Sequence, residues 1–322
     1  MSATIPDREA TDLALGLAVR APSVHNTQPW RWRSADSGVQ LFADTGRQLI
    51  VTDPSLRSLV VSCGAVLHHM RAALAALGWA STVDYCPDPH DPDHLATIQT
   101  TRRPPTDADI ELAAAILLRR TDRRHYLPKP IPARYLRSLA AQVSARGAAV
   151  RQVPDTLLPR LAVPMQHAVA AHATDRLYQE EIARWSGRDR FTDGVPSRNA
   201  PAARPAGEIP VRTFADPALL DPANQPDAAK WLVVGTTRDD RRAQLRAGEA
   251  TSALLLTATE LGLATSVQTE PLGVPDARQE IRTGLLHDCA YPQSMVRVGW
   301  SSRGSAPLAD TPRRPIDEIL EV

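Results

Sequence analysis

The most regular patterns of apolar residues in the chain predict two long, centrally buried helices. The first runs from Leu56 to Trp79 and the second covers residues 244–263. In both, apolar side chains surround most of the helix circumference, which is typical of a helix packed between other elements. Each segment ends in Leu-Gly, and the glycines at 78 and 262 suit the left-handed residue that commonly follows a helix. We therefore expect both helices at the centre of the fold.

The two helical segments also match each other. A shift of 184 residues pairs identical residues at four positions: Arg57 with Arg241, Gly64 with Gly248, Leu77 with Leu261 and Gly78 with Gly262. A strand-like run follows each segment, at residues 95–101 and 294–300. A chance match in an alanine-rich chain is the alternative to duplication, which we prefer. The prolines at 104 and 105 break regular structure and predict the join between a first half, residues 1–105, and a second half, residues 106–322.

Between residues 186 and 226 the pattern changes, because this segment holds seven prolines and three glycines among few apolar residues. An irregular stretch of this length in a compact domain is usually a functional lid or disordered. Helical segments precede it, and a strand-like run starting at Lys230 follows it. Anchoring at both ends favours a lid insertion at 186–226, with disorder as the alternative.

Composition argues against several classes of partner. The chain has 37 basic and 36 acidic residues, so its net charge of +1 gives no reason to expect a nucleic-acid or membrane partner. No apolar run approaches the roughly 18 residues of a membrane-spanning helix, and the N-terminal residues lack the features of a signal peptide. The three cysteines show no CxxC spacing, which predicts neither a disulfide framework nor a zinc site. We expect a cytoplasmic protein.

A basic run, RRTDRRHY, follows the helical segment at residues 108–118. Arg119, Thr121 and Arg123 alternate in it, so in an extended chain their side chains point to one face. Two guanidinium groups and a hydroxyl on one face suit a phosphate dianion, because arginine binds phosphate oxygens bidentately. A solvated or salt-bridged surface is the alternative, because Lys129 and Lys230 are the only lysines and arginine is abundant throughout.

A second segment, APSVHNTQPW at residues 21–30, follows an apolar helical stretch near the N-terminus. Pro22 ends that helix, and Pro29 holds the preceding residue extended. Between the prolines stand side chains that form hydrogen bonds and favour turns: Ser23, His25, Asn26, Thr27 and Gln28. A simple turn from helix to strand would not need so many polar groups, whereas a planar heterocycle with donors and acceptors on its edge would use them.

Together the two segments resemble motifs of the nitroreductase-like FMN flavoprotein superfamily. In that family an R-x-S-x-R motif binds the FMN phosphate, and a PS-x-x-N-x-QPW motif from the other protomer reaches the isoalloxazine ring. Arg119, Thr121 and Arg123 fall on the phosphate motif, with threonine in place of serine. The resemblance implies further FMN contacts from the ring motif, from the strand after the second long helix and from a C-terminal basic pair: Pro22, Ser23, Val24, Asn26, Gln28, Val267, Thr269, Arg313 and Arg314.

The chain departs from the usual family pattern, because neither half carries both motifs. Where the second half should contain a ring motif it reads QVSARGAAVRQVP. This is similar to the double-length Acg-type subfamily, in which two fused halves form one composite FMN site. The resemblance implies an α+β nitroreductase-like fold of two duplicated halves, each with an antiparallel sheet and flanking helices, intertwined as a pseudo-dimer. Self-association would then not be required for the flavin site, and it stays open.

For function, the resemblance implies hydride transfer through N5 of FMN to a small-molecule electron acceptor, nitroaromatic or quinone-like, with NADPH or NADH as the electron donor. This chemistry needs no protein nucleophile, so we assign no catalytic residue. The alternative is a flavin-binding or flavin-storing protein of dormancy or stress, in which the lid covers the FMN and turnover by NAD(P)H is small or absent.

Other chemistry has little support in the sequence. No GxGxxG follows a predicted strand, and neither a P-loop motif nor a GxSxG motif occurs. Cys86, His90 and His94 lack standard ligand spacing and indicate a polar loop, so we expect no metal site. His68 and His69 lie in an apolar helix where adjacent side chains point in different directions, so at most one of them could line a site.

Overall fold

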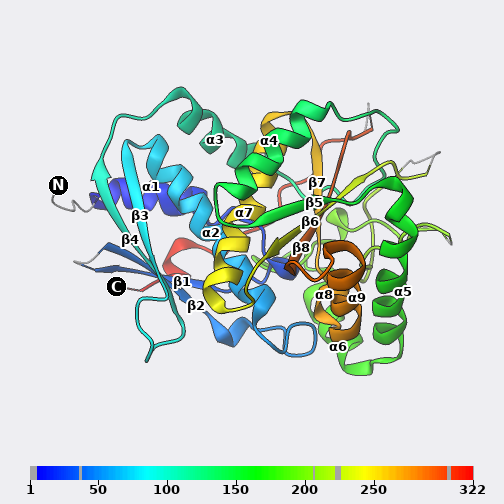
Figure 1. Cartoon of the computed structure of the whole chain (residues 1–322). Helices are drawn as coiled ribbons and strands as arrows, with labels where there is room; N and C mark the ends of the chain where they lie inside the picture. The colour runs from blue at the N-terminus through cyan, green and yellow to red at the C-terminus, as the bar shows by residue number, and fades with distance from the viewer. Residues whose placement is uncertain (1–5, 36–37, 206, 222–225, 303–305, 322) are drawn as a thin grey trace.

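Two β-sheets flank a central pair of long helices (Figure 1). The computed structural model describes all residues except 1–5, 36–37, 206, 222–225, 303–305 and 322. The central helices are α2 (Arg57–Ala76) and α7 (Arg241–Glu260), and both are buried along most of their length. The prediction of two central helices is confirmed. The start of the chain, on which the expectation about a signal peptide rests, lies partly outside the described residues, as does the proline at 222 of the insertion.

Aspartate side chains explain where the central helices begin. Asp53 accepts hydrogen bonds from the backbone N–H groups of Ser58 and Leu59, at 3.0 and 2.8 Å, at the start of α2. Asp240 accepts one from Ala243 at 2.9 Å, at the start of α7. Each carboxylate satisfies N–H groups that have no partner within the first helical turn.

Helix α2 corrects one expectation from composition. Among the described residues it is the one helix long and apolar enough to cross a membrane, although no apolar run of that length was expected. Its most apolar window is 83% buried inside the molecule. It packs against α1 (Arg8–Ala18), α3 (Asp107–Leu118) and α7. Its all-round apolar surface is therefore explained by contacts with helices on several sides.

The first sheet has the strand order β3-β4-β2-β1-β9 and the second the order β5-β6-β8-β7. Neighbouring strands are antiparallel except β1 and β9, which are parallel. The strands are β1 (Trp30–Ala35), β2 (Gly38–Ala43), β3 (Trp79–Tyr85), β4 (His94–Arg102), β5 (Ala149–Gln152), β6 (Lys230–Thr236), β7 (Ala264–Gln268), β8 (Tyr291–Gly299) and β9 (Leu320–Glu321). The predicted antiparallel sheets are confirmed, but the prediction missed β9, a C-terminal strand that joins the sheet of the first half.

Equivalent strands occupy equivalent places in the two sheets. In chain order β1, β2, β3 and β4 correspond to β5, β6, β7 and β8, and both sets have the same spatial order. The central helices each connect the second strand of a set to the third. This common topology supports the duplication inferred from the sequence.

The crossing of α2 and α7 supports the duplication at the level of single residues. A Cβ atom added to Gly64 would overlap the carbonyl oxygen of Leu245, and one added to Gly248 would overlap that of Val61. Positions 61 and 245, like 64 and 248, are 184 residues apart. Such reciprocal contacts are expected when two copies of a helix meet about a pseudo-twofold axis. Glycine at both positions lets the two backbones approach closely.

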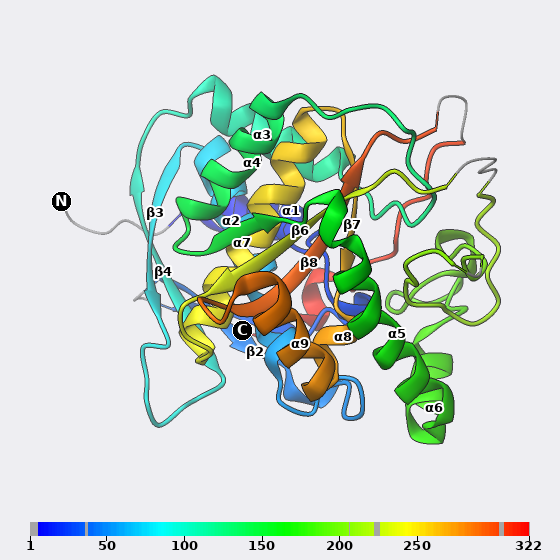
Figure 2. The same cartoon turned by 45° about the vertical axis from the view of Figure 1, so that its right-hand side comes forward.

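The remaining helices lie outside this core (Figures 1 and 2). They are α4 (Ala133–Ser144), α5 (Leu158–Thr174), α6 (Arg176–Trp185), α8 (Glu270–Gly273) and α9 (Pro275–Leu286). Helices α5 and α6 and the segment 186–226 all lie between β5 and β6, whereas only residues 36–37 separate β1 from β2. Relative to the first half, the additional chain in the second half thus begins near residue 153, earlier than the predicted 186.

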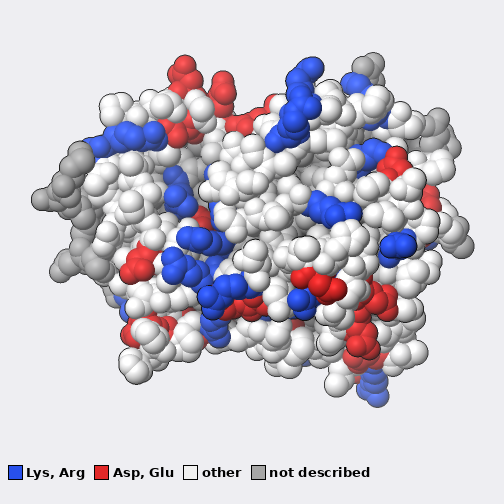
Figure 3. All heavy atoms as spheres, viewed as in Figure 1, with Lys and Arg blue, Asp and Glu red and all other residues white. Residues whose placement is uncertain are grey.

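Charged side chains of both signs are interspersed on the face shown in Figure 3. Many form ion pairs, such as Arg278 with Asp239 at 2.7 Å and Lys230 with Asp155 at 2.7 Å. Exposed pairs of this kind contribute little to stability, about 0–1 kcal/mol each. The arginines without such partners are therefore the informative ones.

Candidate functional site

Two arginines from the second half, the buried Arg119 and the partly exposed Arg313, meet near the C-terminal end of α1. Arg119 follows α3 directly, and its neighbour Thr121 forms a bridge with Thr265 of β7. Arg119 donates to the carbonyl oxygen of Arg20 at 3.4 Å, and Arg313 donates to the same oxygen at 3.0 Å. The shared oxygen shows that Arg119 and Arg313 lie close together, whereas the sequence left open whether Arg313 or Arg314 lies near the phosphate motif.

The charges of these arginines are not balanced by carboxylates. Among the described residues Arg119, Arg123 and Arg313 form no ion pair, and the Nε atom of Arg119 is buried without any hydrogen-bond partner. Burial, followed by the charges of neighbouring arginines, lowers the pKa of Arg119 to about 10 and that of Arg313 to about 9. Burial likewise lowers the pKa of Arg123 to about 10. An anion bound here would offset the positive charge.

The ring motif forms a tight loop between α1 and β1. A short 3-10 helix (Val24–Asn26) lies in it, and His25, Asn26 and Gln28 have positive φ angles of 48°, 55° and 49°. Such angles are uncommon for residues other than glycine and occur often at binding sites. The expectation that Pro29 holds the preceding residue extended is therefore wrong, because Gln28 lies in the left-handed region. The Ser23 hydroxyl accepts a hydrogen bond from the backbone N–H of Gln28 at 2.9 Å, which helps to hold the loop closed.

Two amides of the ring motif bind other parts of the chain. The Asn26 side chain donates to the carbonyl oxygens of Gly194 and Pro312 at 3.0 and 3.1 Å. The Gln28 amide donates to Thr192 at 2.8 Å, and its oxygen accepts from the backbone N–H of Arg314 at 2.8 Å. These side chains therefore connect the ring motif to the insertion and to the C-terminal segment.

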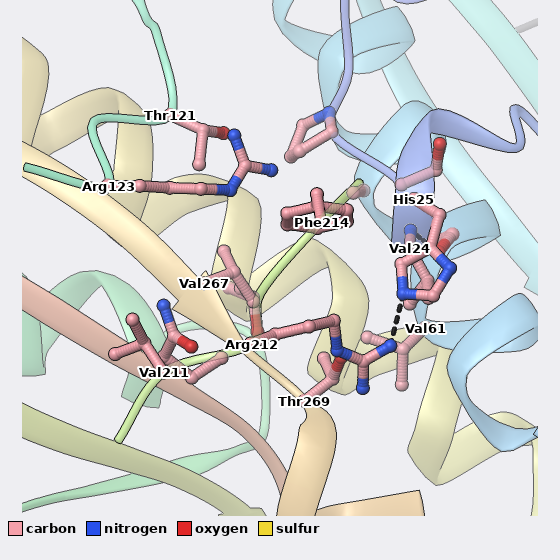
Figure 4. A pocket seen from close by; sticks show the side chains of 16 residues that line it. Val24, His25, Val61, Thr121, Arg123, Val211, Arg212, Phe214, Val267 and Thr269 are labelled. Carbon is pink, nitrogen blue, oxygen red and sulfur yellow. Dashed lines mark hydrogen bonds between the residues drawn. The ribbon is translucent and has the colours of Figure 1, made fainter. Parts of the chain in front are cut away.

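One pocket brings the two halves together (Figure 4). Seven of the twelve residues predicted for the cofactor line it: Pro22, Ser23, Val24, Thr121, Arg123, Val267 and Thr269. The other five do not line the pocket: Asn26, Gln28, Arg119, Arg313 and Arg314. The Arg314 guanidinium instead lies 3.4 Å from carboxylates of Asp44 and Glu318.

The pocket also contains residues that the sequence did not predict. Central helices contribute Val61, Ser62, Ala65 and Thr251, and Gln268 comes from β7. Ser62 accepts a hydrogen bond from the backbone N–H of Val24 at 3.2 Å, so α2 positions the ring motif. A serine at position 62 of a largely apolar helix is a signal that could have indicated which side of α2 faces the pocket.

Three more unpredicted lining residues come from the insertion: Val211, Arg212 and Phe214. Arg212 donates a hydrogen bond to Nε2 of His25, and the Phe214 ring lies edge-on to His25 with a centroid distance of 5.7 Å. The Arg123 guanidinium lies 5.0 Å from the Phe214 ring centre. Burial, and then the charge of Arg212, holds the pKa of His25 well below its usual value. The imidazole is therefore neutral and accepts the arginine N–H.

Further contacts anchor the described part of the insertion to both halves. Arg47 of the first half forms an ion pair with Asp193. His125 of the second half contacts two insertion carboxylates, Asp221 at 2.6 Å and Glu208 at 2.8 Å. The described part of the segment is thus packed against the molecule through polar contacts.

The positions that correspond to this pocket in the other half are filled. Shifted by 184 residues, Ser62, Ala65 and Thr269 match Arg246, Glu249 and Tyr85 respectively. These larger side chains contact one another: the Tyr85 hydroxyl donates to Glu249 at 2.6 Å, and the Arg246 guanidinium lies 5.0 Å from the Tyr85 ring centre.

A fourth residue completes this filled counterpart of the pocket. Arg71 binds the other Glu249 oxygen at 2.6 Å. Burial and the Glu249 carboxylate raise the pKa of Tyr85 to about 12, so its hydroxyl stays protonated and donates. A hydrogen-bonded group of side chains thus occupies the space that is open in the first pocket.

The histidines considered for other roles lie away from the pocket. His68 is buried in α2 between Ser252, at 2.9 Å, and Arg146, at 2.7 Å. His69 is also fully buried. His94 contacts Thr97 at 2.9 Å and stacks on Phe42. Within the part of the chain that the structure describes, no group of three His, Cys, Asp or Glu residues is arranged to hold a metal ion.

Comparison with known proteins gives relatives along the whole chain. “Putative NAD(P)H nitroreductase Rv3131” of Mycobacterium tuberculosis is 45% identical over 324 residues, which cover 100% of this chain and 94% of that protein. “Putative NAD(P)H nitroreductase acg” of the same organism is 37% identical, covering 100% of this chain and 98% of that protein. No family model matches the chain.

Solved structures give a weaker similarity. The FMN-dependent nitroreductase NfnB of Mycobacterium smegmatis, solved in complex with NADPH, has a TM-score of 0.41 and 15% identity, covering 66% of this chain and 97% of that one. The full-length relatives decide the classification. The chain belongs to the nitroreductase-like flavoprotein superfamily, and within it to the double-length Acg-type subfamily.

Proposed function

We propose that this protein is an FMN-binding oxidoreductase of the nitroreductase type, with one composite flavin site per chain. The observation that carries the proposal is that Arg119, Arg123 and Arg313 form no ion pair among the described residues, with Arg119 buried and Arg313 bonded to Ala21 at the start of the strained polar loop from the opposite half. The full-length relatives named as NAD(P)H nitroreductases support the same assignment.

The residues present fit the phosphate of FMN. A phosphate dianion would supply acceptors for the unpartnered Arg119 Nε and would balance guanidinium groups whose pKa is lowered by burial and then by the charges of neighbouring arginines. Thr121 adds a hydroxyl 3.5 Å from Arg119. We assign the phosphate to Arg119, Arg123 and Arg313, and we assign Arg314 to holding Gln28 in place.

The residues present also fit a flat heterocycle. Pro22, Ser23 and Val24 lie on one side of the pocket, and Val267 to Thr269 of the second half lie on another. When bound, FMN supplies two-electron chemistry through N5, with NADPH or NADH as donor and a nitroaromatic or quinone-like compound as acceptor. The protein provides binding, orientation and control of access, and no side chain is assigned as a nucleophile. The filled counterpart around Glu249 supports a single site.

A second candidate is a flavin-holding protein with little turnover, and the position of Arg212 and Phe214 favours it. Both side chains extend from the insertion into the pocket and contact His25 of the ring motif (Figure 4). A lid held in this way would restrict the approach of nicotinamide and acceptor to the flavin.

The test is the visible spectrum and the FMN content of the purified chain, before and after anaerobic addition of NADPH. We expect about one FMN per chain. Bleaching by NADPH would support the reductase, whereas bleaching by dithionite alone would support the flavin-holding protein. Absence of flavin, with no binding of added FMN, would refute both.

A matched variant separates the lid from the site. Arg212→Ala with Phe214→Ala should speed bleaching by NADPH at least tenfold if the two side chains limit access. Leu220→Ala, at an exposed position of the same insertion, serves as the control. Equal rates in wild type and double variant would remove the lid from the proposal and leave the flavin site intact.

A further inference from the structure

A second pocket lies between α5, α6 and the insertion, on the other side of the insertion from the arginine cluster. Its described lining is mainly apolar, with Val169, Ile182, Pro210 and Val211 among its walls. Val211 also lines the flavin pocket, so the two pockets share this wall. Nothing in the proposed flavin chemistry uses the second pocket.

One carboxylate in this pocket has an unused acceptor. Glu270 begins α8, directly after the flavin-pocket residue Thr269, and it is only 5% exposed. Its Oε1 atom accepts from Tyr178 at 3.2 Å and is 3.1 Å from Nδ1 of His172. Its Oε2 atom is buried without any partner. A buried carboxylate oxygen that lacks a donor is costly, so a bound donor would stabilise it.

The carboxylate is ionised and its position is well defined. Burial alone would raise the pKa of Glu270. The hydrogen bond from His172 and the charge of Arg212 outweigh this effect and lower the pKa overall. The rings of His172 and Tyr178 stack with their centroids 3.6 Å apart, which fixes both groups that hold Oε1. The carboxylate that carries the unpartnered Oε2 is therefore held by a rigid support.

Acidic side chains outnumber arginines in the described lining of this pocket, although the charge of Arg212 also acts on Glu270 from outside it. Two carboxylates line it, Glu270 and Glu208. The one arginine in the described lining, Arg204, is already paired with Glu208 at 3.2 Å and with Asp227 at 2.9 Å. An ammonium group forms a charge-assisted hydrogen bond roughly twice as strong as a neutral one, and the apolar walls suit a hydrocarbon body.

We propose that this pocket binds a small organic amine, with its ammonium group on Oε2 of Glu270 and its apolar part against α5, α6 and the insertion. Binding at this place packs the ligand against the insertion segment that carries Arg212 and Val211. The pocket is thus a second small-molecule site, separate from the flavin pocket and independent of the proposed function.

The experiment is a calorimetric titration of the FMN-treated full-length chain with benzylamine, and with benzyl alcohol as a neutral probe of similar shape. We expect benzylamine to bind at least tenfold more tightly than benzyl alcohol. Glu270→Gln should weaken benzylamine binding at least tenfold and leave benzyl alcohol nearly unchanged. Glu280→Gln is the matched control, because Glu280 also pairs with a histidine of α5, at 2.9 Å, but lies outside the pocket.

A second variant keeps the proposal testable if Glu270→Gln does not fold. Ala173→Phe adds bulk at an exposed position of α5 that lines the pocket, and it should abolish benzylamine binding. No binding of benzylamine to the wild type, equal binding of both probes, or unchanged binding in Ala173→Phe would each overturn the proposal. This experiment measures amine binding and not flavin chemistry. A negative result therefore does not bear on the FMN assignment, and amine binding can still be tested if the chain binds no FMN.

Discussion

Arg119 illustrates how a buried arginine that has no carboxylate partner among the described residues indicates an anion-binding site. Its sequence context indicated a phosphate site and left open an ordinary basic surface. The structure favours the first reading, because Arg119 is buried beside Arg313 while surface arginines such as Arg278 have carboxylate partners. The lining residues Arg212 and Phe214 could not be predicted, because the proline-rich segment that carries them has no periodic pattern to fix which side chains turn inward.

Removing charge from the arginine cluster should weaken FMN retention. Arg119→Ala should raise the FMN dissociation constant roughly 10- to 100-fold, because a hydrogen bond to a charged group contributes about 1.5–3 kcal/mol. Asn26→Ala should also weaken retention, because Asn26 ties the ring motif to Gly194 and Pro312. Fluorescence titration with FMN measures both. Arg102→Ala, on the first sheet against Trp79, is the control, and wild-type affinity in both test variants would refute the composite site.

At the scale of elements, the two long helices and the strands β4, β6 and β8 followed from the pattern of apolar residues. Strand β9 did not, because two residues at the end of the chain carry no recognisable strand pattern. The sequence predicted only part of the helix crossing. It matched Gly64 with Gly248 as a repeat, but it did not predict the direct contact of the two glycines, because that contact depends on the crossing angle. Local patterns thus predict elements better than they predict how those elements meet.

The crossing should tolerate no added methyl group. Gly64→Ala would push a Cβ into the Leu245 carbonyl and should lower the free energy of unfolding by about 1–3 kcal/mol or more, as overpacking does. Gly16→Ala in α1 is the matched control, because nothing lies within 4 Å of its added Cβ. That variant should be unchanged or stabilised by about 0.5–1 kcal/mol. Equal stability of the two variants in urea unfolding would contradict the close crossing.

The buried histidines of α2 should make the protein sensitive to acid. Burial lowers the pKa of His68 and His69 well below the ordinary 6.5, so both are neutral in the folded state. The unfolded chain takes up these protons below about pH 6.5, so stability is full above that pH and falls below it, by about 1.4 kcal/mol per pH unit for each histidine. His69→Leu should reduce this slope between pH 6.5 and 5, and the exposed His90→Leu should not. Equal slopes in urea unfolding would show that His69 does not contribute.

At the scale of the whole molecule, the sequence indicated two halves sharing one site, and the contact of α2 with α7 agrees with that organisation. The sequence did not indicate that α5 and α6 belong to the additional chain of the second half. Their helical patterns are ordinary, and nothing in them shows that the first half has no corresponding helices. The side-chain group around Glu249 could not be predicted from the sequence either, because the residues that form it are distant in sequence and meet only in the folded chain.

The two halves should depend on each other for folding. The fragments 1–105 and 106–322, produced together, should copurify as a complex, because separation would expose the apolar surfaces of α2 and α7. Affinity capture through a tag on one fragment, followed by size-exclusion chromatography, measures this. A soluble, folded fragment 1–105 obtained alone would show that the halves are independent domains. It would refute the prediction that the two halves are intertwined.

The C-terminal segment has a consequence for synthesis on the ribosome. Arg313 completes the arginine cluster, and β9 covers the edge of β1, although almost the whole chain separates them from the N-terminal elements that they contact. During translation, the edge strand β1 of the first sheet therefore stays unpaired on one side, and the arginine cluster stays incomplete. Only a nascent chain that has been translated through Arg313 and β9 can assemble both, so earlier termination would yield products that lack Arg313 and the edge strand.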